Sequence, residues 1–135
     1  MEEYVSGKKI ILAIDDDPMI LKVLVSLLVP EYDLRIVNSA VEAMTDIERI
    51  LPDLILLDIE MPYISGFEFL HTIKKNPKFM KTPVVIVSGH SEEKIVTRTQ
   101  KSGASCMVAK PIDREDLLQK INYAFKNPIT NIFGL

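Results

Sequence analysis

The sequence predicts one doubly wound α/β domain, in which helices cover both faces of a parallel sheet. Five short apolar runs alternate with segments whose apolar residues recur at helical spacing, a pattern typical of parallel strands joined by crossover helices. A length of 135 residues suits a single domain with its own core. Hydrophobic residues make up 47% and charged residues 26%, a balance typical of ordered globular proteins.

The first predicted strand and helix meet at a run of acids. Segment 8–14 is too short for a typical helix, and its continuous apolar character predicts a strand buried on both faces. Asp17 before Pro18 resembles a capping acid followed by proline at the first helical position, so we expect a helix that ends near Pro30. Its expected inward residues are Ile20, Val23, Leu24, Leu27 and Leu28.

The second and third strands lie on either side of the second helix. Segment 33–37 is a short strand, and Ser39 followed by Glu42 predicts a capping box at the start of a helix. This helix stops before Pro52. Its inward residues are expected to be Ala43, Met44, Ile47 and Ile50. The apolar run 54–57 is the third strand, and an acid follows it directly.

A loop separates the third strand from the third helix. Pro62 and Gly66 mark this loop, and helical spacing resumes over residues 67–75. The β-branched run 83–87 predicts the fourth strand, which ends at Ser88.

The remaining elements complete five strand-helix units. Ser91 is expected to cap the fourth helix, because two glutamates follow it in the first turn. Segment 105–109 predicts the fifth strand. Asp113 is expected to cap a final helix over residues 114–125.

The composition argues against several partners and environments. A net charge of -3, the absence of Trp and 7% aromatic residues give no reason to expect direct binding to nucleic acid or to an anionic membrane. The basic cluster at 74–81 is interpreted as a helix end and a loop. Residues 19–29 are too few to cross a bilayer, and no basic segment precedes an apolar one as in a signal peptide. We therefore expect a cytoplasmic protein.

Some residues have plain structural interpretations. Residues 1–126 are expected to form the domain and residues 127–135 a tail or linker. Asp17 is expected to act only as a cap, His71 to be solvated, and Cys106 to be a core residue without an internal disulfide partner.

The polar strand ends are expected to converge. In doubly wound sheets the ligand crevice lies beyond the carboxyl ends of the strands. The residues placed there are Asp15, Asp16, Asp58, Ser88 and Lys110. Clustered carboxylates raise one another's pKa, and a divalent cation removes that difficulty. Mg²⁺ suits a few carboxylates, and the backbone carbonyl of Glu60 is a candidate further ligand.

Asp58 is the candidate nucleophile of this crevice. It has no acid beside it, whereas Asp15 and Asp16 are adjacent and suited to hold an ion. With Mg²⁺ on one side and the ammonium group of Lys110 on the other, its carboxylate is placed to attack a phosphoryl group. The resulting acyl phosphate adds charge and acceptor oxygens that can recruit the hydroxyl of Ser88.

These residues resemble the receiver domain of two-component response regulators, from about residue 8 to about residue 126. "IDDDP" is similar to the family's acidic pair, which implies a direct metal ligand at Asp16 and a water-mediated one at Asp15. "LLDIEMPYISG" resembles the phosphoacceptor loop, which implies that Asp58 is phosphorylated and that its carboxylate and the Glu60 carbonyl both bind the metal.

The second half of the chain extends the resemblance. "VSG" matches the family's switch hydroxyl at Ser88, and "GA" at Gly103 and Ala104 matches the turn before the last strand. "KP" resembles the family's lysine, here Lys110, with a following proline that is often cis. The resemblance also implies a flavodoxin-like three-layer sandwich with strand order 2-1-3-4-5.

Three positions concern regulation. Met107 stands where the family usually carries an aromatic switch residue, so the coupling of Ser88 to an aromatic rotamer is in doubt. Glu60 and His90 stand where the family tunes the lifetime of the phosphoryl group. In the family the fourth and fifth helices often form the contact face, which here includes Ile95, Tyr123 and Phe125 unless these are core residues.

The resemblance implies a signalling switch that acts only on its own phosphorylation. Asp58 would take the phosphoryl group from a phosphohistidine of a histidine kinase or phosphotransfer protein. The alternative from another class is a haloacid-dehalogenase-like phosphatase with Asp15 as nucleophile, because Asp15 and Asp17 have its Asp-x-Asp spacing. Against it, Met19 stands where that motif requires Thr or Val. A flavin-binding protein of this fold is a third interpretation, which a hydroxyl-rich phosphate loop would support and the chain lacks.

Overall fold

The computed structural model describes residues 7–128 and contains one five-stranded parallel sheet of order β2-β1-β3-β4-β5. The strands are β1 (Ile10–Ile14), β2 (Asp33–Val37), β3 (Leu54–Asp58), β4 (Val84–Ser88) and β5 (Cys106–Ala109). The helices are α1 (Pro18–Leu28), α2 (Ala40–Ile50), α3 (Gly66–Lys74), α4 (Glu93–Lys101) and α5 (Arg114–Lys126). The predicted fold class and strand order are confirmed.

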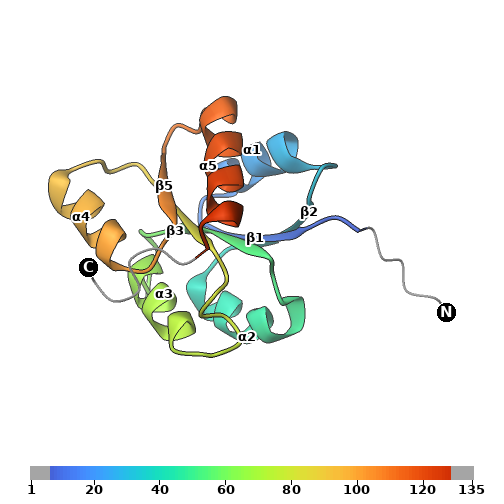
Figure 1. Cartoon of the computed structure of the whole chain (residues 1–135). Helices are drawn as coiled ribbons and strands as arrows, with labels where there is room; N and C mark the ends of the chain where they lie inside the picture. The colour runs from blue at the N-terminus through green and yellow to red at the C-terminus, as the bar shows by residue number, and fades with distance from the viewer. Residues whose placement is uncertain (1–6, 129–135) are drawn as a thin grey trace.

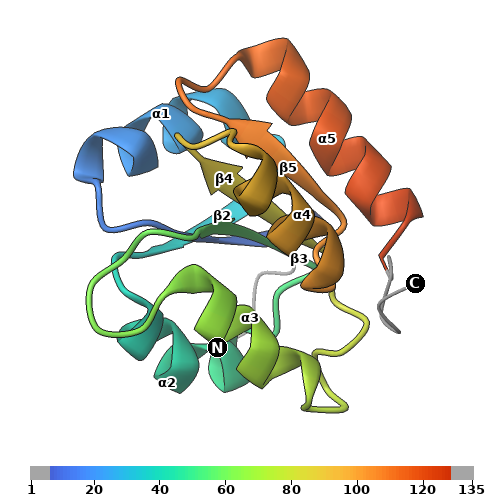
Figure 2. The same ribbon diagram turned by 90° about the vertical axis from the view of Figure 1, so that its left-hand side faces the viewer.

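The sheet lies between two helical layers (Figures 1 and 2). Helices α1 and α5 pack on one face, and α2, α3 and α4 lie on the other. Because alternate strand residues point to opposite faces, Ile11 and Ala13 of β1 face α1 and α5, whereas Leu12 and Ile14 face the other layer. All four side chains are at most 1% exposed, which confirms that β1 is buried on both faces.

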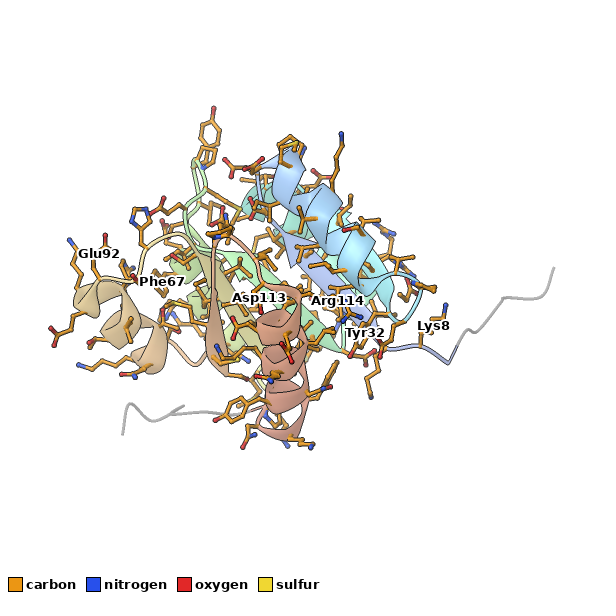
Figure 3. All side chains as sticks on the ribbon, turned by 90° about the horizontal axis from the view of Figure 1, so that it is seen from above. Lys8, Tyr32, Phe67, Glu92, Asp113 and Arg114 are labelled. Carbon is orange, nitrogen blue, oxygen red and sulfur yellow. The ribbon has the colours of Figure 1, made fainter. Side chains whose placement is uncertain are left out.

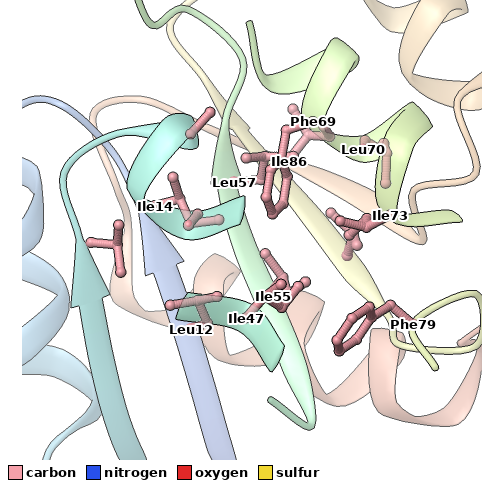
Figure 4. Packing of buried hydrophobic residues seen from close by; sticks show 14 of the residues in the cluster. Leu12, Ile14, Ile47, Ile55, Leu57, Phe69, Leu70, Ile73, Phe79 and Ile86 are labelled. Carbon is pink, nitrogen blue, oxygen red and sulfur yellow. The ribbon is translucent and has the colours of Figure 1, made fainter. Parts of the chain in front are cut away.

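The core beneath α2 and α3 is aliphatic with a few large rings (Figure 4). Phe69, Leu70 and Ile73 of α3 pack against the strands, and Phe79 of the following loop is buried in the same cluster. This apolar packing holds the carboxyl ends of the strands in register, so that the polar residues after them are fixed by the sheet.

Several predicted helix starts are confirmed and one is wrong. The carboxylate of Asp17 accepts a hydrogen bond from the Met19 amide at 2.9 Å, and Asp113 caps α5 in the same way. Ser91, however, does not cap α4. The N-cap is Glu92, without a side-chain hydrogen bond, because the loop after β4 is held back against Ser88 and the helix begins only at Glu93.

Two further details differ from the sequence-based expectations. In α2 the Ser39 hydroxyl accepts from the Glu42 amide at 3.1 Å, but among the described helices the complete capping box is in α3, between Ser65 and Glu68. In α1 the fully buried stripe is Leu21, Leu24 and Leu28. Val23 was expected to face inward but is 36% exposed, since it lies off this stripe. The expected tail 127–135 lies almost entirely outside the described residues.

Candidate functional site

The sheet brings the predicted polar residues to one edge. Asp58 and Ser88 are the last residues of β3 and β4, while Asp15 directly follows β1 and Lys110 directly follows β5. β3 lies between β1 and β4 in the sheet, so three of these strand ends are consecutive neighbours. Asp15, Asp58 and Ser88 are buried, whereas Asp16 is exposed.

The carboxylates of Asp15, Asp16 and Asp58 form one cluster. One carboxylate oxygen from each residue lies within 4.8 Å of the others. Oδ2 of Asp15 is buried, and the ammonium nitrogen of Lys110 lies 3.0 Å from it. One ammonium group does not balance three clustered carboxylates, so a further cation would offset their mutual repulsion. These oxygens therefore fit a hard divalent cation such as Mg²⁺, which prefers oxygen ligands and retains water on its exposed side.

Lys110 supplies the fixed positive charge of the site. Its Nζ lies 3.0 Å from Oδ2 of Asp15 and 3.5 Å from Oδ1 of Asp58. Burial lowers the pKa of Lys110, but its bonds with the two carboxylates outweigh this, so the net shift is upward. Burial, followed by repulsion from Asp15, raises the pKa of Asp58 to about 6 despite the opposing effect of Lys110. Asp58 is therefore mostly ionised at neutral pH and able to act as a nucleophile.

Each acidic strand end is held by the loop that follows it. Oδ1 of Asp15 accepts a hydrogen bond from the amide of Asp17 at 2.9 Å, and Oδ1 of Asp58 accepts one from the amide of Glu60 at 3.2 Å. These short turns fix the side-chain orientation by local hydrogen bonding. These loop hydrogen bonds therefore orient both carboxylates at the carboxyl edge of the sheet.

Ser88 and His90 form a corresponding turn after β4. The Ser88 hydroxyl donates to the carbonyl of His90 at 3.2 Å, and the His90 amide donates to that hydroxyl at 3.0 Å. The imidazole Nε2 of His90 lies 2.5 Å from Oε1 of Glu60, and its Nδ1 lies 3.3 Å from Oε1 of Glu92. The hydrogen bonds with Glu92 and then Glu60 raise the pKa of His90.

Glu60 and His90 are both predicted from the sequence as site residues, but their contact is not. Each lies two residues beyond the end of a strand, and β3 and β4 are neighbours that pair Asp58 with Val87. A histidine and an acid at equal distances beyond adjacent parallel strands are the signal that would have predicted the pair. The structure thus places a bridge between two loops at the rim of the acidic cluster.

Met107 connects β5 to α4 rather than to the acidic cluster. Its sulfur lies 3.8 Å from the hydroxyl of Thr99, and its side chain packs against the core cluster beneath α2 and α3. Met107 pairs in register with Ile86, two residues before Ser88 on β4. The predicted switch residue therefore lies at the junction of α4 and β5, and its role in switching stays a prediction.

Gly66 brings α3 against the backbone of Asp58. A Cβ atom at Gly66 would lie 2.3 Å from the carbonyl oxygen of Asp58 and 2.6 Å from Cα of Ile59. Real Cβ atoms never approach backbone this closely, so only glycine fits here. The start of α3 is therefore in direct contact with the peptide that carries the Asp58 side chain.

The residues given plain interpretations behave as expected in most cases. His71 is exposed, and Cys106 is partly buried, with burial raising the pKa of its thiol to about 11. Such a thiol is inert at neutral pH. Tyr123 is 45% exposed, whereas Ile95 and Phe125 are partly buried against the two core layers. The peptide between Lys110 and the next proline is cis, as the resemblance implied.

Comparison with known proteins agrees with this geometry. The family profile named "Response regulator receiver domain" matches residues 11–122. A solved structure of a CheY-like response regulator receiver domain protein from Methanospirillum hungatei is 29% identical, with a TM-score of 0.80, covering 90% of this chain and 96% of that one. Among curated relatives, hybrid signal transduction histidine kinase D of Dictyostelium discoideum is 27% identical over 89% of this chain, and a protein-glutamate methylesterase/protein-glutamine glutaminase of Myxococcus xanthus is 29% identical over 84%. The chain spans 8% and 36% of the lengths of these two relatives.

Proposed function

The chain belongs to the response regulator receiver domain family, a phosphoacceptor switch of two-component signalling, and on that premise we propose that Asp58 is the phosphoryl acceptor. The observation that carries this assignment is the position of Asp58. It is a buried carboxylate at the end of β3, with the Lys110 ammonium 3.5 Å away and the carboxylates of Asp15 and Asp16 beside it.

The reaction is an in-line transfer to the Asp58 carboxylate. Its oxygen attacks the phosphorus of a phosphohistidine, the P–N bond breaks, and the donor imidazole takes the electron pair and a proton. The ammonium of Lys110 stabilises the phosphoryl oxygens as charge develops. Asp15, Asp16 and the Glu60 carbonyl would hold Mg²⁺, and the bound ion would supply further positive charge to those oxygens. The side chains that act on the transferred phosphoryl group therefore all belong to the receiver itself.

Ser88 converts this chemistry into a signal. The aspartyl phosphate adds about 1.5 to 2 negative charges and three acceptor oxygens at neutral pH. In the unphosphorylated structure the Ser88 hydroxyl donates to the His90 carbonyl. The phosphoryl oxygens would compete with this carbonyl for the same hydroxyl. The loop after β4 and the start of α4 shift when the hydroxyl changes partner, and Met107 and Thr99 carry the shift to β5.

The phosphoryl donor is a histidine kinase or histidine phosphotransfer protein, and the output is binding of a partner. The match with a hybrid histidine kinase supports this class of donor. Within residues 7–128 no helix is long and apolar enough to span a bilayer. No observation favours the phosphatase alternative, since the family profile that matches residues 11–122 is that of the receiver domain.

Acetyl phosphate with Mg²⁺ tests the assignment by intact mass. The wild-type protein and Asp15→Asn are expected to gain one phosphoryl group, the variant more slowly, and Asp58→Asn is expected to gain none. Turnover of phosphomonoesters that persists in Asp58→Asn and disappears in Asp15→Asn would instead establish the phosphatase.

A further inference from the structure

The charges of the chain are unevenly distributed. Residues 66–104 run from the start of α3 to the loop after α4. They contain seven Lys or Arg and three Glu, whereas the whole chain carries a net charge of -3. The basic excess of this segment is therefore set against a strongly acidic remainder. Such a local field attracts acidic partners and orients them before contact.

Helices α3 and α4 enclose a hollow of about 380 Å³ within this segment. It is lined by Phe67, Glu68, His71, Arg98, Lys101 and Ser102. A second, more open hollow of about 750 Å³ follows the outer side of α4 and shares Arg98 and Lys101 with the first. Because they share Arg98 and Lys101, we treat the two hollows as one path along α4, and Figure 3 labels Phe67 beside this helix. We call this path the α3/α4 groove.

Arg98 is held in place at the centre of the groove. Its guanidinium carbon lies 4.3 Å from the ring centroid of Phe67, which is 8% exposed and forms part of the core. Stacking of the planar guanidinium leaves its N–H edges free for a carboxylate. Neither Arg98 nor Lys101 forms an ion pair within residues 7–128. An incoming carboxylate would therefore meet a donor that has already lost much of its side-chain freedom.

Helix stability accounts for only part of the basic stripe of α4. Lys94, Arg98 and Lys101 follow one another at helical spacing on the exposed side, while Thr99 is the one fully buried residue of the helix. Positive charge in the last turn favours a helix through its dipole, which explains Arg98 and Lys101. The same dipole disfavours Lys94 in the first turn, and like charges at this spacing repel. Binding of an acidic partner relieves that repulsion.

Both walls of the groove begin at the phosphorylation site. Helix α3 starts at Gly66, in contact with the backbone of Asp58, and α4 starts after the loop in which the His90 amide bonds to the Ser88 hydroxyl. A change of state at Asp58 therefore acts on both helices. The spacing of Phe67 and Arg98 across the groove depends on the relative position of these helices.

We propose that the α3/α4 groove binds an acidic segment of a partner protein, and that phosphorylation of Asp58 changes its affinity, the second part resting on the proposed function. An acidic peptide fits better than nucleic acid. Glu68 and Glu93 line the two hollows and repel a continuous phosphate backbone, whereas a peptide can place carboxylates at Arg98 and Lys101 and neutral side chains elsewhere.

Fluorescence anisotropy of a fluorescein-labelled peptide of alternating Glu and Ala tests the first part, without phosphoryl donor. Replacement of both cations, Arg98→Gln with Lys101→Gln, is expected to weaken binding at least about tenfold, since two charge-assisted contacts are lost. Arg98→Lys keeps the positive charge but removes the planar guanidinium that lies over the Phe67 ring. We expect an intermediate loss of peptide affinity. The matched control Arg114→Gln with Lys126→Gln removes the same charge from exposed positions on α5 and is expected to leave affinity nearly unchanged.

Equal losses in both double variants would show attraction by net charge alone and overturn the proposal. An Arg98-dependent gain of anisotropy with a single-stranded oligonucleotide, but none with the peptide, would overturn it in favour of nucleic acid.

Acetyl phosphate with Mg²⁺ then tests the second part: a severalfold change of peptide affinity is expected in the wild type and none in Asp58→Asn. Phosphorylation seen by intact mass without any peptide binding refutes the groove alone, and peptide binding without phosphorylation refutes the proposed function alone.

Discussion

Nε2 of His90 lies 2.5 Å from Oε1 of Glu60, which joins the loop after β4 to the loop after β3 at the rim of the acidic cluster. The two side chains are 45% and 60% exposed, so the pair is formed at the surface. We expect water that hydrolyses an aspartyl phosphate at Asp58 to approach over this rim. We therefore predict that the pair lengthens the lifetime of the phosphoryl group.

Removal of this pair is expected to shorten that lifetime. His90→Ala and Glu60→Ala should each speed loss of the phosphoryl group a few-fold, because either change opens the rim to water. The double variant should be no faster than the faster single variant, since both remove the same contact. Decay of phosphorylated protein followed by intact mass measures this. Fully multiplicative effects would show that the two residues act separately.

Mg²⁺ is expected to stabilise the folded protein through Asp16. A ligand at ten times its Kd adds about 1.4 kcal/mol to the free energy of unfolding. Thermal unfolding with Mg²⁺ or with EDTA should show this increase for the wild type and lose it in Asp16→Asn. Asp17→Asn is the matched control, because Asp17 caps α1 through the Met19 amide and should keep the response to Mg²⁺. A response that persists in Asp16→Asn would contradict the ligand assignment.

Asp58→Asn is expected to stabilise the metal-free protein above pH 6. Burial raises the pKa of Asp58 from 3.8 to about 6, so between these values the folded state holds a proton that the unfolded state releases. Stability is therefore lost as the pH rises through this window, and Asn avoids that loss. The variant should gain on the order of 2 kcal/mol above pH 6 and nothing below pH 3.8.

Urea unfolding at a series of pH values in EDTA measures this difference. Glu115→Gln removes an exposed carboxylate of α5 and should change stability by less than about 0.5 kcal/mol at every pH. A gain in Asp58→Asn that is independent of pH would show that the carboxylate is not held in an unfavourable charged state.

Lys110→Ala is expected to slow phosphorylation at least about tenfold, because it removes the ammonium that faces the transferred group. It also leaves Asp15 and Asp58 without their shared counter-charge, so the pKa of Asp58 should rise further. The initial rate of labelling by acetyl phosphate measures the first effect. Lys126→Ala, an exposed lysine at the end of α5, should label at the wild-type rate.

Gly66→Ala is expected to destabilise the protein by about 1 to 3 kcal/mol, because its methyl group would overlap the Asp58 carbonyl and the backbone must move. The same movement shifts the nucleophile and should slow phosphorylation. Gly89→Ala is the matched control, since nothing lies within 4 Å of a Cβ atom there. Chemical denaturation compares the two variants, and equal stability would show that α3 does not depend on this close approach.

The sequence alone determined the elements and the residues at their ends. Apolar runs bounded by acids, prolines and glycines located every strand, and Asp17 and Asp113 were recognisable as caps because capping depends on neighbours in the chain. The start of α4 was misplaced at Ser91, because its position is set by a contact with Ser88 rather than by local capping.

Only the tertiary structure decided which polar groups touch. The sequence placed Glu60 and His90 two residues beyond their strands, but their contact requires the parallel pairing of β3 and β4. Likewise, Arg98 reaches the ring of Phe67 only because α3 and α4 lie on the same face of the sheet. Local pattern fixes secondary structure because it depends on neighbouring residues, whereas contacts between distant residues depend on how the sheet and its layers are assembled.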